Sequence, residues 1–214
     1  MDAFRLEIVL IPLPFQLYII TLCKKGNEPF YKRMMDITFY KFIAKGNDKV
    51  GGVLYAPPGW PYPIAEDGEE VMNWKSLVVE LKYGKYRHFQ LCTGGANMVS
   101  VELKTLIESF IDSDPSLEFL PVKATSEEYG DKEYYIMHFK KIFDVTDKEN
   151  TVYFEATDTI LKLRLDYAKV KNLKVFNSQP AVNDIIVSED VCKAIKKNKL
   201  DLGLGFMPVY CVNG

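Results

Sequence analysis

The chain is poor in residues that bind metals or act as bases. Among its 214 residues are four cysteines and two histidines: Cys23, Cys92, Cys192, Cys211, His88 and His138. The cysteines lack the C-x-x-C spacing of zinc sites, and two histidines leave few further ligands. We therefore expect buried, reduced thiols, no metal and no cofactor, which fits a reducing compartment.

The chain also lacks an excess of charge of either sign. Its 27 basic and 29 acidic residues give a net charge of -2. A general nucleic-acid binder normally carries a basic stripe, so this class is disfavoured. Hydrophobic residues make up 48% and charged residues 26%, which is a globular balance. The length suits one large domain or two small ones with a real core.

No apolar run is long enough for a membrane span. The most apolar stretch, residues 8–23, is interrupted by two prolines and a glutamine and is shorter than the ~20 residues that cross a bilayer. Asp2 and Glu7 stand where a signal peptide has positive charge. We interpret residues 1–33 as an N-terminal extension outside the core fold. It could be a hairpin or edge strand, a poor export signal, or a segment before a true start near Met34.

Alternating apolar residues predict a β-rich chain. DITFYKFIA, residues 36–44, has period two and aromatic residues on both sides, as expected of a strand covered on both faces. Leu161, Leu163 and Leu165 alternate with charged residues, which is typical of a sheet with one solvent face. Further strands are predicted at residues 74–84, 133–145, 150–156, 159–167 and 171–177.

Two stretches of the chain share one pattern. Residues 97–110, NMVSVELKTLIESF, and 184–198, DIIVSEDVCKAIKKN, each place a β-branched residue before a serine and then apolar residues at helical spacing. Ser100 and Ser188 stand where a helix N-cap is expected. A Phe-x-Pro-Val segment follows each predicted helix, so each unit is predicted to form a strand, a capped helix and a return strand.

Aligned on the two serines, the units match at several structural positions. The matched pairs are Val99 with Val187, Leu103 with Val191, Ile107 with Ile195, Phe119 with Phe206, Pro121 with Pro208 and Val122 with Val209. We predict an internal duplication, at about residues 74–124 and 170–211, within one α+β domain of residues 34–214. Its fold would be antiparallel β-sheets with two capped helices. The alternative is chance convergence of two helix–strand units.

These motifs resemble a family of bacterial immunity proteins found with polymorphic toxins, the eleventh immunity type, formerly a domain of unknown function. The resemblance is best over residues 170–210 and extends over 74–145, where YYIMHFKKIFDVTD resembles the family's central strand. Residues 1–33 have no counterpart. The resemblance implies a cytoplasmic protein without catalytic activity that binds one cognate toxin domain. It supplies no catalytic residues.

The chain lacks the usual catalytic motifs. The sequence around Gly94-Gly95 has no Gly-Lys-Ser/Thr ending of a phosphate-binding loop, and Ser100 and Ser188 are not in a G-x-S-x-G motif. The alternative hypothesis is a small cytosolic enzyme or ligand-binding α+β protein. Its site would lie near Cys92–Gly95, with His88 as a partner of the thiol.

One aromatic loop and two acidic loops form the candidate toxin-contact surface. Tryptophan and tyrosine at residues 55–63 would be rigid anchors, while the acidic runs at 65–70 and 126–131 would steer and hold a basic toxin cleft. The alternative is that these are plain solvated loops. The predicted partner-binding residues are Trp60, Tyr62, Glu66, Asp67, Glu69, Glu70, Glu127, Glu128 and Asp131.

Overall fold

The computed structural model divides the chain into two compact units, residues 1–36 and 37–214. It describes residues 8–13, 16–21, 39–45, 52–60, 68–93, 95–111, 116–154, 159–179 and 184–212. In the first unit, β1 (Ile8–Leu13) pairs with β2 (Gln16–Thr21) as an antiparallel hairpin. The second unit contains both predicted repeats and all the candidate site residues.

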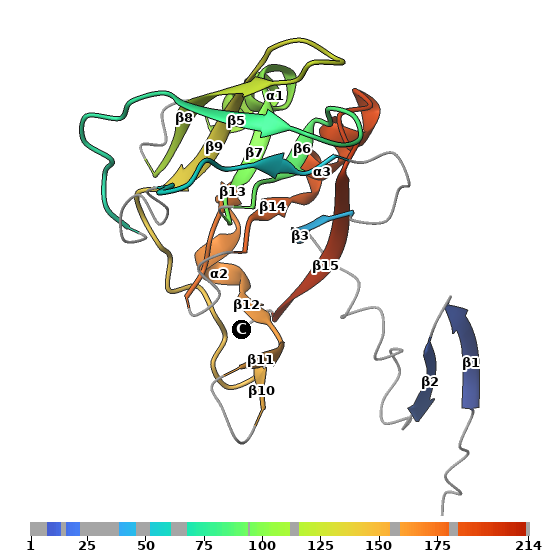
Figure 1. Ribbon diagram of the computed structural model, residues 1–214. Helices are drawn as coiled ribbons and strands as arrows, with labels where there is room; N and C mark the ends of the chain where they lie inside the picture. Colours follow the sequence, from blue (N-terminus) through green and yellow to red (C-terminus); the bar gives the residue numbers. More distant parts are fainter. Residues whose placement is uncertain are drawn as a thin grey trace, which may run out of the picture. The chain divides into compact units, whose positions relative to one another are not determined.

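The second unit is a mixed α+β fold made mostly of strands, as predicted, with two larger curled sheets (Figure 1). The first has the order β4 (Leu54–Tyr55), β5 (Leu77–Leu81), β8 (Leu117–Thr125), β9 (Lys132–Phe139), β7 (Asn97–Ser100), β6 (Phe89–Leu91). The second has the order β12 (Arg164–Asp166), β15 (Leu204–Val212), β3 (Phe39–Ala44), β14 (Ile186–Ser188), β13 (Val175–Phe176). The helices are α1 (Val101–Ile111), α2 (Tyr167–Val170) and α3 (Glu189–Lys197).

The two larger sheets share one order of pairing. In the first, β6, β7, β9 and β8 pair antiparallel in turn, and β8 then pairs parallel with β5. In the second, β13, β14, β3 and β15 pair antiparallel, and β15 pairs parallel with β12. The matched prolines take the same place, since Pro121 lies opposite Tyr135 and Pro208 opposite Tyr40.

The prediction of purely antiparallel sheets is wrong at one pair in each larger sheet. Between β5 and β8 the chain forms a hairpin and α1, and between β12 and β15 it forms α2, a hairpin and α3. These connections are long enough to return the chain in its starting direction, as a parallel pair requires.

Only one of the two predicted serine caps makes a side-chain hydrogen bond with a helix amide. The amide of Leu103 donates to Ser100 Oγ at 3.3 Å, which caps α1 as predicted. Ser188 does precede α3, but its hydroxyl donates to the carboxylate of Asp190 instead. Asp190 Oδ1 accepts the N–H of Val191 at 3.1 Å. Ser188 therefore takes the predicted N-cap position, but its side chain accepts no hydrogen bond from a helix amide, and its hydroxyl donates to the acidic residue of the first turn.

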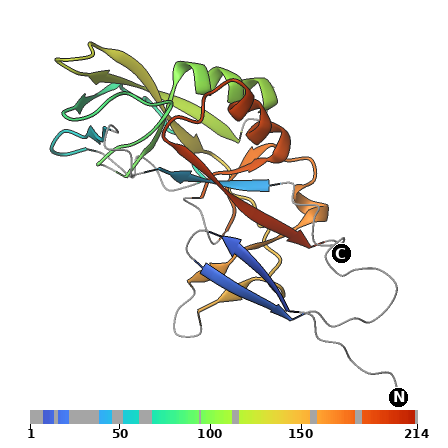
Figure 2. The same ribbon diagram turned by 90° about the vertical axis from the view of Figure 1, so that its right-hand side faces the viewer.

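Both longer helices bury their apolar faces in one shared core. Leu103 and Ile107 of α1 and Val191 and Ile195 of α3 are fully buried in it. Figure 2 shows α1 and α3 side by side. Burial of each such side chain contributes about 1.5–3 kcal/mol. This shared core, which also contains strand residues of both larger sheets, therefore ties the two repeats into one body.

The first sheet curls around a second, inner cluster. Leu54 of β4 bridges to Cys92 just beyond β6, and the amide of Thr93 donates to the carbonyl of Leu54 at 2.9 Å. The inside of the curl is filled by buried residues that include Leu54, Val79, Met98, Leu120, Tyr134 and Ile136. The outside of β4 and β5 thus faces away from the hydrophobic interior.

The predicted strand at 159–167 is split. Strand β11 (Ile160–Lys162) pairs with β10 (Val152–Tyr153) in a separate hairpin, whereas β12 joins the second sheet. Leu165 is buried, Leu163 half-buried and Leu161 62% exposed. The expectation of one strand with a common leucine face is wrong, because the two halves of the run pair with different partners.

Candidate functional site

The described acidic residues of the predicted contact surface lie at opposite ends of β9. Glu69 and Glu70 lie beside its last residue, since Gly68 donates its N–H to the carbonyl of Phe139 at 3.1 Å. The turn at 126–131 precedes its first residue. Eight residues of β9 separate the two groups by roughly 23 Å at about 3.3 Å per residue. The predicted residues outside the described part of the chain are Tyr62, Glu66 and Asp67.

The segment that carries Glu69 and Glu70 is fastened to β8 and β9. His138 Nε2 donates to the carbonyl of Glu69 at 2.6 Å, and Glu118 accepts the N–H of Val71 at 3.1 Å. Glu70 lies 3.8 Å from Lys140 Nζ. The backbone here is fixed by the sheet beneath it, and one of its two carboxylates already has a basic neighbour.

Trp60 is half-buried rather than freely presented. Its backbone N–H donates to the carbonyl of Pro57 at 3.2 Å, closing a tight turn. Its indole packs against the inner cluster of the first sheet, and the indole Nε1 is buried without a hydrogen-bond partner among the described residues. Its role as an anchor for a partner stays a prediction, with only part of the ring available for contact.

The turn at 126–131 is a rigid support for exposed acids. Gly130 has a φ of +68°, a backbone conformation that glycine adopts at no steric cost, and its N–H donates to the carbonyl of Ser126 at 3.0 Å. Tyr86 Oη donates to the carbonyl of Gly130 at 2.9 Å. Glu127 and Glu128 are exposed on this turn. A hydrogen bond with Glu128 raises the pKa of Tyr129.

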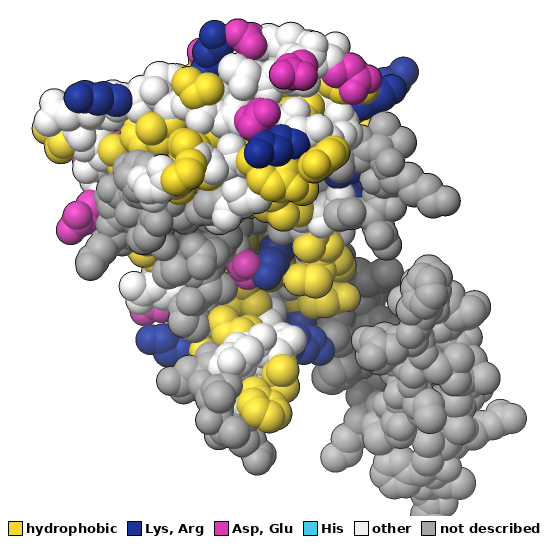
Figure 3. Space-filling view, viewed as in Figure 1, with side chains coloured by type: hydrophobic (Ala, Val, Ile, Leu, Met, Phe, Trp, Pro, Cys, Tyr) yellow, Lys and Arg dark blue, Asp and Glu magenta, His cyan; other side chains and the backbone are white. Residues whose placement is uncertain are grey.

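The structure also reveals an apolar surface that the sequence did not predict, on the outside of β4 and β5. Here we call it the β4–β5 face, formed by Val53, Tyr55, Val78, Glu80, Lys82 and Tyr83. Val78 is 53% and Tyr83 73% exposed. The rings of Tyr55 and Tyr83 meet edge-on, with centroids 6.5 Å apart. Figure 3 shows hydrophobic side chains gathered over β4 and β5, with charged side chains among them. The alternation of residues in LVVELKY (77–83) is the sequence feature that could have predicted this face.

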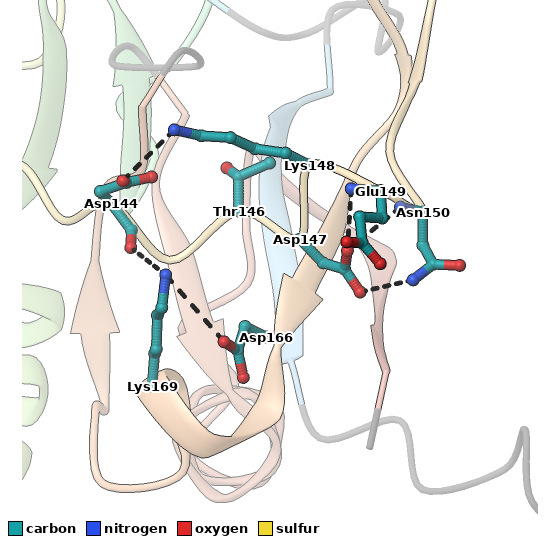
Figure 4. A pocket seen from close by; sticks show the side chains of 8 residues that line it. All are labelled: Asp144, Thr146, Asp147, Lys148, Glu149, Asn150, Asp166 and Lys169. Atoms are coloured by element: carbon teal, nitrogen blue, oxygen red, sulfur yellow. Dashed lines mark hydrogen bonds and ion pairs between the residues drawn. The ribbon is translucent and has the colours of Figure 1, made fainter. Parts of the chain in front are cut away.

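A hollow of about 420 Å³ lies beside the β10–β11 hairpin (Figure 4). Its charged side chains form hydrogen bonds and ion pairs mainly with other residues that line the hollow. Lys169 Nζ lies 3.2 Å from the carbonyl of Asp144 and 4.0 Å from Asp166. Asp147 accepts the amides of Glu149 and Asn150, both at 3.1 Å. These carboxylates hold a turn together, which explains their positions without a ligand. Among the described residues, no group of three His, Cys, Asp or Glu side chains could hold a metal ion.

A Ser-His-Glu cluster lies at the start of α1, but its geometry is structural. His88 Nδ1 is 2.9 Å from Ser100 Oγ and 3.8 Å from Glu102, so one ring nitrogen meets both groups. In a catalytic triad the two ring nitrogens would each take one partner. A hydrogen bond from Ser100 lowers the pKa of Glu102.

The second repeat builds the same cluster with a lysine in place of the histidine. Lys174 Nζ lies 2.6 Å from Asp190, which also accepts from Ser188. The backbone N–H of Ser100 donates to the carbonyl of His88, and that of Ser188 donates to the carbonyl of Lys174, both at 2.9 Å. Because a lysine fills the same place, the cluster's shared task is to fasten a hairpin to a helix start.

Cys92, the proposed centre of the alternative site, is buried. Its side chain is 5% exposed and belongs to the inner cluster of the first sheet. Its N–H donates to the carbonyl of Ala96 at 3.1 Å, closing the turn that precedes β7. His88 is hydrogen-bonded with Ser100. An apolar, enclosed setting of this kind suits a structural thiol.

Comparison with known proteins decides the family. The model of the immunity protein family Imm11 matches residues 63–210, which is more than half of the chain. The chain belongs to this family. The resemblance seen in the sequence is thus confirmed, over a range that includes residues 74–145 and 170–210. No curated protein matches the chain. The described part of this Imm11 protein contains no helix both long and apolar enough to cross a membrane.

Proposed function

We propose that this Imm11 protein binds one cognate toxin domain in the bacterial cytoplasm and neutralises it by occluding its active site. The match to an immunity family over residues 63–210 is the observation that carries the proposal. The toxin would belong to a polymorphic toxin system. The exposed carboxylates at 126–131 and 69–70 support a partner with a basic cleft. Such groups speed association with a basic partner and can pair with its lysine and arginine side chains.

The alternative, an enzyme or ligand-binding protein with a site at Cys92–Gly95, has less support. Its thiol is enclosed in the inner cluster, whereas activated cysteines are partly exposed and lie near positive charge. The serine cluster at α1 has a lysine counterpart at α3, which fits a fastening role. Both features favour a protein that acts by binding.

We further infer that the two larger sheets are copies of one ancestral unit. Their shared pairing order and the matched places of Pro121 and Pro208 support this. The position filled by β9 in the first sheet is filled by β3 in the second. The central strand of the second copy therefore comes from an earlier part of the chain. On this view residues 34–214 form one binding domain, with residues 1–33 as an extension.

A growth assay tests the function. The C-terminal domain encoded by the neighbouring upstream reading frame would be expressed in a test bacterium with and without this chain. We expect that domain to stop growth, and co-expression of this chain to restore it. A toxic domain that kills equally in the presence of this chain would refute immunity towards that partner.

The occlusion mechanism needs a second readout. The toxin's catalytic activity, measured in vitro, should fall in proportion to the complex formed, and substrate should compete with this chain for the toxin. Tight binding without loss of the toxin's activity would contradict occlusion and leave immunity to act by another route.

A further inference from the structure

We propose that the toxin is held by the β4–β5 face together with the adjoining turn at 126–131, and that it presents an apolar patch bordered by lysine or arginine side chains. This inference rests on the proposed function. It selects one of the two separated acidic groups and adds an apolar surface that neither group contains.

Among the described residues, the helices leave the β4–β5 face exposed. Leu54, Val79 and Leu81 point into the inner cluster and are at most 4% exposed. Their neighbours along the strands, which include Val53 and Val78, are 42% and 53% exposed on the other side. The helices pack elsewhere: α1 lies against β7, β9 and β13, and α3 against β3 and β14. Figure 1 shows β4 and β5 in front with α1 behind them.

The β4–β5 face is continuous with the acidic turn. The parallel pairing of β5 with β8 puts Glu80 beside Thr125, and the turn begins one residue later. The surface therefore runs from Tyr55 and Tyr83 across the end of β5 to the exposed acids of the turn. By contrast, Glu69 and Glu70 lie at the far end of β9.

The β4–β5 face and the turn offer a partner different kinds of contact. Tyrosine gives a large contact area for little loss of side-chain freedom and is enriched among interface residues that dominate affinity. On the turn, Asp131 already has a cation, since it lies 2.7 Å from Lys123 Nζ. Glu127 and Glu128 make no ion pair with a described residue. Two carboxylates that make no ion pair with a described residue, on a turn next to a face that exposes Tyr83, fit a partner that is apolar at the centre and basic at the rim.

The test compares matched pairs of exposed side chains. Tyr83→Ala with Val78→Thr removes the apolar part, and Phe154→Ala with Leu161→Thr is its control on the β10–β11 hairpin, where the native side chains are 50% and 62% exposed. Glu127→Gln with Glu128→Gln removes the charged part, and Glu69→Gln with Glu70→Gln is its control. Thermal unfolding of every variant should match the wild type, because all these side chains are exposed.

Binding would be measured by surface plasmon resonance against the upstream-encoded toxin domain, recovered from its complex with the wild-type chain by denaturation and refolding. We expect the Tyr83/Val78 variant to weaken binding by about tenfold or more through faster dissociation. We expect the Glu127/Glu128 variant to slow association about severalfold and to flatten its salt dependence. Both controls should stay within about twofold.

The outcomes separate the two ideas. A wild-type chain that neither binds the domain nor rescues growth refutes the proposed function. Wild-type binding that is unchanged in the Tyr83/Val78 variant refutes this surface alone. The same holds if the control on the hairpin or at Glu69/Glu70 weakens binding more than its counterpart.

Discussion

At the scale of single residues, α1 and α3 both begin after a serine but use its side chain differently. Ser100 caps α1 directly, whereas Ser188 gives its hydroxyl to Asp190. Burial alone would raise the pKa of Asp190, but hydrogen bonds from Lys174 and Ser188 outweigh it and lower the pKa. The charged form of Asp190 is therefore favoured by folding.

The acid dependence of stability should reveal this carboxylate. Because the folded-state pKa of Asp190 lies below the value of about 3.9 for an unfolded chain, its stabilisation is full above that pH. It is lost as the pH falls through the folded-state pKa. Asp190→Asn should lower the free energy of unfolding by about 0.5–1 kcal/mol at pH 7. Urea denaturation at pH 7 and pH 3 would measure the difference.

The loss caused by Asp190→Asn should shrink at pH 3, because that pH lies below the unfolded-state pKa and folding must then remove a proton from the carboxyl. Glu149→Gln, which changes an exposed carboxylate, is the control and should have little effect at either pH. A loss from Asp190→Asn that stays constant with pH would show that its charge is not the stabilising feature.

Thiol reactivity tests the alternative site at the same scale. Cys92 is enclosed in the inner cluster, while Cys211 is half-buried. We expect iodoacetamide to label Cys211 well before Cys92 in the folded protein, with Cys92 reacting only on unfolding. Peptide mass spectrometry would resolve the two sites. Fast labelling of Cys92 under native conditions would support a reactive site at Cys92–Gly95.

At the scale of elements, helices were more predictable than strand partners. The helix at 101–111 and its return strand follow from a serine, an apolar stripe and a proline that are all local in sequence. The prediction for the run at 159–167 was wrong because its halves pair with residues far along the chain. The site was foreseen less well for the same reason. Alternation predicted β5, but the exposure of its outer side depends on where the helices pack.

Each helix also places a lysine over an equivalent pair of rings. Lys104 Nζ lies 4.8 Å from the ring centre of Tyr135 and 5.4 Å from that of Phe119. Lys196 Nζ lies 4.9 Å from the ring centre of Phe206 and 5.8 Å from that of Tyr40. The rings take matched places in the two sheets, while the lysines stand one helical turn apart when the repeats are aligned on their serines. Both helices thus place a lysine over these rings, but from different sequence positions.

Removing one of these lysines should measure the contact between helix and sheet. Lys196→Ala should lower the free energy of unfolding by about 0.5–1 kcal/mol, as for an exposed cation over an aromatic ring. Lys197→Ala is the control, because Lys197 is in the same last turn and shares the favourable interaction with the helix dipole. Urea denaturation would compare them. Equal losses would assign the effect to the dipole and not to the rings.

At the scale of the whole molecule, the two larger sheets share one hydrophobic core, and we expect them to fold together. Phe42 of the second sheet and Phe89 of the first meet edge-on, with ring centres 5.7 Å apart. The amide of Phe89 donates to the carbonyl of Leu202, 3.2 Å away and close to the start of β15. Neither helix has a complete apolar environment without the other. Because α1 and α3 bury their apolar faces in one core, a change in one helix should be felt by the other.

Unfolding should therefore be a single transition, and the tryptophans make this testable. Both tryptophans, Trp60 and Trp74, pack against the inner cluster of the first sheet, so their fluorescence reports on that half. Ile195 of α3 is fully buried in the shared core, and Ile195→Ala should cost about 2–5 kcal/mol. If the halves fold together, this change must shift the fluorescence transition in urea as much as the far-UV circular dichroism transition.

Leu161→Ala, on the exposed hairpin, should shift neither. A fluorescence transition that keeps its wild-type midpoint in Ile195→Ala would show that the first repeat folds alone and that the shared core is only a contact between two domains.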